Sequence, residues 1–405
     1  MISLLLISLA LSFSPGVDAG ARSTLPADPA AVVAPADQPV AAPPAPPPGE
    51  VLAQTQAGVA VVPPGTEVVS PQPAWMNAAS YWLIAVIIFA LSAASLTSAL
   101  MSRRDMVATD DPLMRRFRTK LRVWWVMTAI LMIGFLFHYV GTVILFGLVS
   151  FWALREFITM TPTRRGDHRT LFWVFFIFLP MQYLLVLLGN SSPEWLFGRS
   201  DIDFYGLYSI FIPVYASLFI PARIALSGDS KRFLERSAII QAGLLICVYS
   251  LSYAPALLEL KLMKTDGTVW GGRNVSLLLF MLLIAQLAAL FERLWSRWGG
   301  RHLLAARING SRTWEGLFGS MVTTGFIAAA LYWATPFMPW EAGVMGAIVA
   351  MMAIAGTLTM SAIKRDRGVN DTGTLVQGHA GLLDQIDNVC FAAPVFYHLT
   401  RFFYT

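Results

Sequence analysis

Residues 123–154 read VWWVMTAILMIGFLFHYVGTVILFGLVSFWAL, a run with no lysine, arginine, aspartate or glutamate. As one α-helix this run would be about 48 Å long at 1.5 Å per residue, far beyond the ~30 Å hydrocarbon core of a bilayer. The run therefore predicts two membrane-crossing helices that turn near His138-Tyr139-Val140-Gly141.

The rest of the chain has the same apolar character. Of its 405 residues, 56% are hydrophobic and only 13% are charged, and the mean hydropathy is +0.61. Soluble domains carry roughly 25% charged residues, so this chain lacks the polar surface that a soluble globule of this size needs. We expect an all-α fold, a polytopic helical membrane protein with about ten transmembrane helices after an N-terminal signal-like segment. Soluble enzyme folds are excluded.

Ten apolar segments fit a bilayer crossing. They are 80–100, 122–137, 140–156, 170–189, 206–225, 237–257, 275–293, 317–335, 341–362 and 388–403. Most of the 29 lysines and arginines lie in five alternate loops, at 101–122, 155–169, 223–236, 293–313 and 364–367. By the positive-inside rule these loops are cytoplasmic. The net charge of +5 is thus read as a topology signal and not as a nucleic-acid surface.

Three regions are expected along the chain. Residues 1–20 resemble a signal peptide, although they lack a basic n-region and an uncleaved anchor also fits. Residues 21–75 are rich in proline and alanine and predict a disordered extracytoplasmic arm. Residues 80–405 form the membrane-embedded domain. This arrangement predicts an integral protein of a bacterial inner membrane with its active face in the cytoplasm.

The apolar segments hold few groups suited to chemistry. Cys247 and Cys390 lie inside apolar blocks without metal-binding neighbours, so both are read as packing residues. Glu156 and Glu292 sit at segment ends beside arginines, so the deep membrane positions are almost free of ionisable groups. Ion-coupled transporters keep ionisable groups near the membrane midplane, so the sequence does not favour transport.

The last basic loop combines cations, carboxylates and glycines. Lys364 and Arg365 can hold phosphate oxygens, while Asp371, Asp384 and Asp387 can hold Mg²⁺. Asp384 and Asp387 are three residues apart and share a helical face if the last helix begins there. These groups suit phosphoryl or nucleotidyl transfer at the membrane surface. Taken singly, they also fit a solvated loop with topogenic basic residues and a helix N-terminus capped by aspartates.

The order of these residues resembles the signature of CDP-diacylglycerol synthases, also called phosphatidate cytidylyltransferases. That signature runs Ser-x-x-Lys-Arg, Lys-Asp, Pro-Gly-His-Gly-Gly and Leu-x-Asp-Arg-x-Asp. The matching positions here are Ser361, Lys364, Arg365, Asp371, Gly373, Gly378, His379, Gly381, Asp384 and Asp387. A second stretch one basic loop earlier resembles the family's Lys-Thr-x-Glu-Gly run and comprises Arg312, Thr313, Trp314, Glu315 and Gly316. The run from Gln286 to His302 resembles the preceding family helix.

The resemblance implies a reaction in which CTP and phosphatidic acid, or a related lipid phosphate, give CDP-diacylglycerol and pyrophosphate. It implies catalytic roles for Asp371, Asp384, Asp387 and His379, with Asp371 and Asp384 as Mg²⁺ ligands. His379 is a candidate general base, but positioning of phosphate is the preferred role. Substrate binding is expected at Ser361, Lys364, Arg365, Gly378, Gly381 and residues 312–316. The bilayer is a partner, a homodimer is one assembly considered, and nucleic acid is not expected.

Several family positions are changed. Ala289 replaces an aspartate, Asn309-Gly310 a Ser-Pro pair, Arg312 a lysine, Asn370 a lysine, Ala380 a glycine and Gln385 an arginine. Charge-assisted phosphate contacts contribute roughly 1.5–3 kcal/mol each, so these losses bear on activity. Two alternatives therefore stay open: a catalytically weak or inactive relative that binds lipid or protein, and a cytidylyltransferase for another lipid phosphate.

Overall fold

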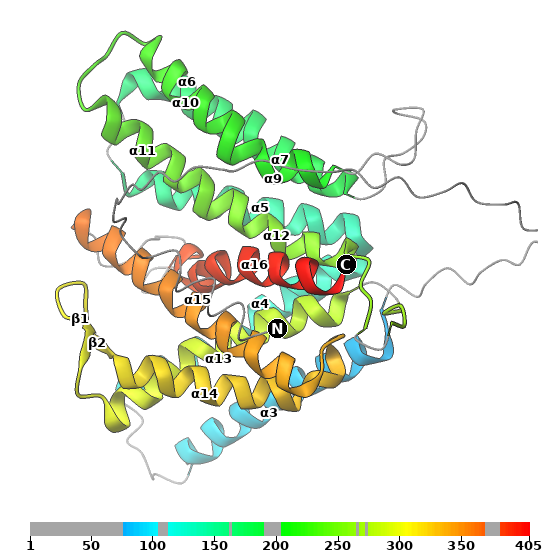
Figure 1. Cartoon of the computed structure of the whole chain (residues 1–405). Helices are drawn as coiled ribbons and strands as arrows, with labels where there is room; N and C mark the ends of the chain where they lie inside the picture. The colour runs from blue at the N-terminus through cyan, green and yellow to red at the C-terminus, as the bar shows by residue number, and fades with distance from the viewer. Residues whose placement is uncertain are drawn as a thin grey trace, which may run out of the picture. The chain divides into compact units, whose positions relative to one another are not determined.

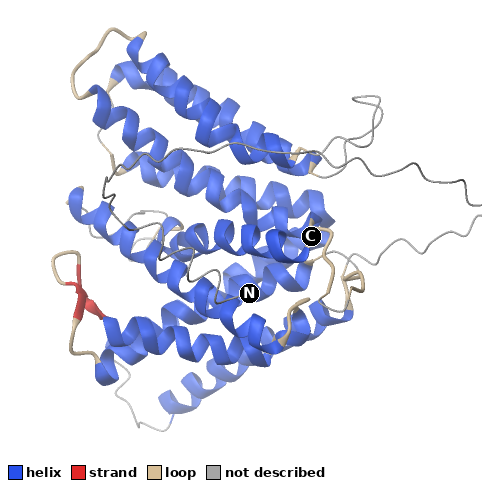
Figure 2. Cartoon of the chain, viewed as in Figure 1, coloured by secondary structure: helices blue, strands red, loops and turns tan. Residues whose placement is uncertain are grey.

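A computed structural model describes residues 76–103, 112–161, 164–189, 204–264, 267–271, 274–368 and 381–405. The predictions made for residues 1–75, and for Asp371, Gly378 and His379, lie outside the described residues. The described chain is mostly helical, with one short two-stranded hairpin and connecting loops (Figure 2).

Ten helical segments follow one another in the described residues, some joined by π or 3₁₀ turns (Figure 1). The first three are α3 (Ala78–Arg103), α4 (Pro112–Leu136) and α5 (His138–Thr159). The next three are each interrupted by a π-helical turn: α6–α7 (His168–Trp173, Leu179–Leu188), α9–α10 (Tyr205–Ile210, Ser217–Ala225) and α11–α12 (Phe233–Leu244, Ser250–Ala256). The last four are α13 (Val275–Gly299), α14 (Trp314–Ala330), α15 (Pro339–Asp366) and α16 (Leu383–Tyr404).

These helices coincide with the ten predicted segments. Eight of them are long and apolar enough to cross a bilayer, and the two others are α14, which has 17 residues, and α16. The predicted turn in the 123–154 run is confirmed, because α4 ends at Leu136 and α5 begins at His138, whose φ is +60°. An L-residue rarely adopts this left-handed conformation, which ends one helix and redirects the chain into the next.

The polar loop between α13 and α14 contains the hairpin of β1 (Leu303–Ala305) and β2 (Asn309–Thr313), which pair antiparallel. Helices α13, α14, α15 and α16 then pack against one another. Small residues make this packing close: a Cβ at Gly346 of α15 would lie 2.3 Å from the Cβ of Ala328 in α14. The hairpin, the end of α15 and the start of α16 lie at one end of the bundle, here called the site end (Figure 1).

Candidate functional site

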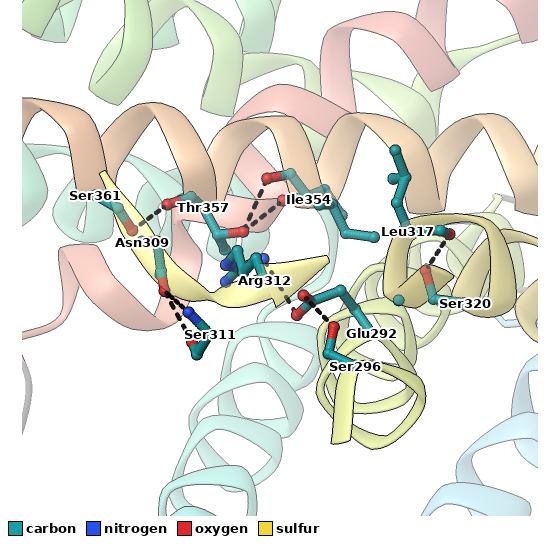
Figure 3. Close-up of polar contacts among 12 residues, drawn as sticks. Glu292, Ser296, Asn309, Ser311, Arg312, Leu317, Ser320, Ile354, Thr357 and Ser361 are labelled. Carbon is teal, nitrogen blue, oxygen red and sulfur yellow. Dashed lines mark hydrogen bonds and ion pairs between the residues drawn. The ribbon is translucent and has the colours of Figure 1, made fainter. Parts of the chain in front are cut away.

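A buried ion pair joins the hairpin to α13. Arg312 of β2 points toward Glu292 of α13, with Nη1 3.3 Å from Oε2 (Figure 3). Their side chains are 7% and 1% exposed. Since buried charges are costly unless paired, this contact fixes Arg312 beside the end of α13. Glu292 lies one turn after the buried Ala289 on the same helix.

A chain of hydroxyl contacts places the first turn of α14. The Ser296 hydroxyl donates to Glu292 at 3.2 Å, and the Thr313 hydroxyl donates to Ser296 at 3.0 Å. Thr313 is also the N-cap of α14, since its hydroxyl accepts the Gly316 amide at 3.0 Å. A threonine cap satisfies one of the free amides of a helix start, which is why the helix begins here.

Glu315, in the first turn of α14, contacts the chain just before β1. Its carboxylate accepts the backbone amides of Arg301 and His302, and His302 Nδ1 lies 2.6 Å from Oε1. The hydrogen bond from His302 and the backbone amides lower the pKa of Glu315 to about 2. Neighbouring Trp314 is half exposed and stacks on Phe318, so it faces outward from the site. Glu315 is therefore a clamp on the hairpin and not simply a solvated acid.

A second ion pair joins the end of α15 to the start of α16. Lys364 Nζ donates to Asp384 Oδ1 at 2.7 Å, and both side chains are largely buried. The other carboxylate oxygen, Asp384 Oδ2, is buried without a hydrogen-bond partner among the described residues. One turn earlier, the Ser361 hydroxyl donates to the Thr357 carbonyl, and Arg365 Nε donates to the Ile308 carbonyl in the hairpin turn.

The start of α16 is held by a residue that the sequence interpretation did not assign to the site. Glu156, at the end of α5, accepts the amides of Leu382 and Leu383 at 3.0 and 2.8 Å. No aspartate of the described residues caps this helix, because its N-cap is Leu382 and two of its free amides are satisfied by Glu156 from a distant helix. Asp384 and Asp387 lie in the first turns of α16, as their spacing predicted.

Further cations surround this cluster. Lys120 of α4 and Arg293 of α13 both lie within range of charge interactions with Glu292, Arg312 and Asp387. Asp387 is buried, and its Oδ1 accepts the amide of Asn388. The sequence interpretation counted Lys120 and Arg293 only as topogenic charges. The sequence feature that could have assigned them to the site is their position, since each lies within a turn of the end of an apolar segment.

The structure thus gathers most of the described candidates at the site end. Arg312, Thr313, Glu315 and Gly316 lie on the hairpin and α14, and Ser361, Lys364 and Arg365 on the last turns of α15. Gly381, Asp384 and Asp387 lie at the start of α16, where the Gly381 carbonyl accepts the Asp384 amide. Trp314 points away. The described residues contain no group of three or more His, Cys, Asp or Glu side chains placed to hold a metal.

Comparison with known proteins supports the family resemblance that the two polar loops indicate. A model of the cytidylyltransferase family matches residues 118–403. The uncharacterized protein YnbB of Escherichia coli is 30% identical over 285 residues, which are 70% of this chain and 87% of that protein.

Two relatives carry an enzyme name. The phosphatidate cytidylyltransferase of Mycobacterium leprae is 38% identical over 98 residues, or 24% of this chain and 31% of that protein. The phosphatidate cytidylyltransferase of Haemophilus influenzae is 27% identical over 176 residues, or 41% of this chain and 59% of that protein. The family match spans all of the elements from α5 to α16 that meet at the site end, and the chain belongs to the cytidylyltransferase family.

Proposed function

We propose that this protein transfers the cytidylyl group of CTP to phosphatidic acid, forming CDP-diacylglycerol and releasing pyrophosphate. The observation that carries the proposal is Asp384: one oxygen is held by Lys364, and the other is buried and unpartnered among the described residues. A buried carboxylate oxygen without a partner is costly, and a functional site is where such a cost is retained. We assign the site end of the helix bundle to the cytoplasmic side of the membrane, where CTP is available.

In the proposed reaction an oxygen of the lipid phosphate attacks the α-phosphorus of CTP. The bond from that phosphorus to the bridging oxygen breaks, and pyrophosphate leaves with the electron pair. The lipid phosphate is already anionic near neutral pH, so no strong general base is needed. The task of the protein is to hold two anionic substrates together and in line. Arg312, Lys364 and Arg365 supply the positive charges that hold the phosphates of the two substrates in line.

The donor set fits Mg²⁺, which prefers oxygen ligands and keeps several waters or phosphate oxygens. The free Oδ2 of Asp384 offers one position, and Asp371 is proposed as the second ligand from the motif alone. When bound, the ion would neutralise triphosphate charge. Asp387 is proposed to support Asp384, since the two lie one turn apart.

A second candidate is a relative that binds lipid or a partner protein without turnover. It is favoured by the buried Ala289, which leaves α13 without the acid expected there, and by the pairing of Arg312 with Glu292. A cation that already neutralises a carboxylate has less charge to offer a phosphate. A cytidylyltransferase acting on another lipid phosphate is the third, closely related case.

The test is incorporation of radiolabelled CTP into lipid by the purified protein in detergent, with phosphatidic acid and Mg²⁺. We expect product from the parent, and a loss of roughly 100-fold or more in Asp384→Asn, the scale of removing one group that stabilises transition-state charge. Omitting Mg²⁺ is expected to abolish product.

Asp366→Asn is the matched control, because Asp366 ends α15, is 69% exposed and pairs with neighbouring Arg367 at the surface. It should retain the parent rate. A parent that folds yet makes no product from phosphatidic acid or other lipid phosphates would establish the second candidate. An unchanged rate in Asp384→Asn would remove the carboxylate from the mechanism.

A further inference from the structure

A large apolar cavity lies beside the site. Its volume is about 740 Å³, within the ~300–1,000 Å³ range of ligand pockets. Helices α3, α4, α5, α13 and α16 form most of its wall, and aliphatic side chains dominate the lining, among them Ile87, Leu91, Leu131, Leu283 and Val389. We call this cavity the chamber. An aqueous substrate such as CTP does not match so apolar a lining, whereas an acyl chain does.

A few polar side chains also line the chamber. The indole nitrogens of Trp124 and Trp152 are buried and have no hydrogen-bond partner in the described part of the chain. Trp124 lies at the middle of α4, two residues after Arg122, and Trp152 lies about two turns before the end of α5. Each is a donor only, so each requires an acceptor oxygen. Gln286 and Gln385 also line the chamber, and the Gln286 amide donates to the Gln385 carbonyl at 3.2 Å.

A basic cavity adjoins the chamber. It has a volume of about 420 Å³ and is lined by Ser95, Ser98, Ala99, Arg118, Leu121, Arg122 and Trp125. Arg122 lines both cavities, so the two meet at its side chain. Arg118 is one turn before Arg122 on the same face of α4. Trp125 donates to the Ser95 hydroxyl at 3.1 Å and so ties α4 to α3 at this point.

The two cavities offer three kinds of surface in sequence: the cations Arg118 and Arg122, then the indole donors of Trp124 and Trp152, then the aliphatic lining of the chamber. A membrane lipid with an anionic headgroup has the complementary order: phosphate, ester oxygens, acyl chain. A free phosphate would leave the aliphatic chamber unmatched. The chamber also touches the site, because Leu382, Gln385 and Ile386 on its wall flank Asp384 in the first turn of α16.

We propose that a phospholipid with a net negative headgroup binds with an acyl chain in the chamber, its ester oxygens at Trp124 and Trp152, and its phosphate at Arg118 and Arg122. Helix α3 precedes the stretch matched by the family, residues 118–403, and closes one side of the chamber. This inference takes the lipid as the acceptor from the proposed function, but it concerns binding and is tested without turnover.

The experiment uses the full chain in phosphatidylcholine nanodiscs that contain phosphatidic acid with a diazirine in its acyl chain. After irradiation, labelled peptides are mapped by mass spectrometry. We expect label on chamber-lining residues of α3 and α4. Ala94→Trp places an indole ring in the chamber and should lower that label strongly, whereas Ala85→Trp is the control, since Ala85 is exposed on α3 and lines neither cavity.

The headgroup is tested separately. Arg122→Gln should lower labelling roughly tenfold, the equivalent of one charge-assisted contact. Arg122 is exposed, so this change spares the packed interior. Arg169→Gln is its control, because Arg169 is an exposed residue of α6 and lines neither cavity. Diazirine-labelled phosphatidylcholine, which lacks the net negative charge, should label the chamber weakly.

Equal labelling of the parent, Ala94→Trp and Arg122→Gln, or label confined to other helices, would overturn the inference. The two proposals fail separately. Turnover of CTP without chamber labelling would leave the enzyme and remove the lipid site. Chamber labelling with the expected variant pattern but no product would leave the lipid site and remove the enzyme.

Discussion

The Arg312–Glu292 pair is the residue-scale contact on which the hairpin depends. Removing one partner of a buried ion pair leaves an uncompensated charge, which costs about 3–5 kcal/mol. We therefore expect Glu292→Gln to lower the unfolding midpoint in detergent strongly. Glu235→Gln is the control, because the Glu235 carboxylate is 33% exposed and pairs with Arg232 and Arg367, and ion pairs open to solvent contribute about 0–1 kcal/mol each. Equal midpoint shifts in the two variants would contradict a structural role for the buried pair.

Glu315 gives the hairpin a dependence on acid. Its pKa is about 2 in the folded protein against an ordinary value of 4.5, so the carboxylate stabilises the fold above pH 4.5 and this contribution is lost as pH falls toward 2. Unfolding midpoints of the parent and Glu315→Gln should differ at pH 6 and converge across that window. A difference that stays constant from pH 6 to pH 2 would show that the carboxylate is not the source.

At the scale of elements, α13 and α14 approach too closely for a side chain at Gly316. A Cβ there would lie 2.0 Å from Ser296 Oγ and 2.8 Å from the Glu292 carbonyl, and the carbonyl belongs to a helix that cannot yield easily. Gly316→Ala should cost about 1–3 kcal/mol of stability, as overpacking does. Gly206→Ala, where nothing lies within 4 Å, should be neutral or stabilising, and chemical denaturation of both variants is the comparison.

The elements themselves show what a pattern can and cannot predict. Apolar length predicted all ten helical segments, and the turn at His138 followed from the limit on helix length. The β1–β2 hairpin was not predicted, because residues 303–313 show no alternation of apolar and polar residues. The Glu156 cap on α16 was also missed, since it joins positions 226 and 227 residues apart that become neighbours only in the folded bundle.

For the whole molecule, the alternation of basic loops predicts which ends of the helices face the cytoplasm. Ser230 and Val269 lie exposed at opposite ends of the α11–α12 segment. In intact cells, a membrane-impermeant maleimide should label Val269→Cys and not Ser230→Cys, and both should react after lysis. Native Cys247 and Cys390 are buried, so the parent should stay unlabelled. The reverse pattern would place the site end outside the cytoplasm and contradict the proposed supply of CTP.

The sequence by itself determined that this chain is a helical membrane protein, where its segments lie, and which family its last two polar loops resemble. These properties depend on local composition and on the order of residues along the chain. Only the tertiary structure decided the partners: Arg312 with Glu292, Lys364 with Asp384, and Glu156 with the start of α16. The physical reason is that burial makes charge pairing decisive, and burial is a property of packed helices that no single segment carries.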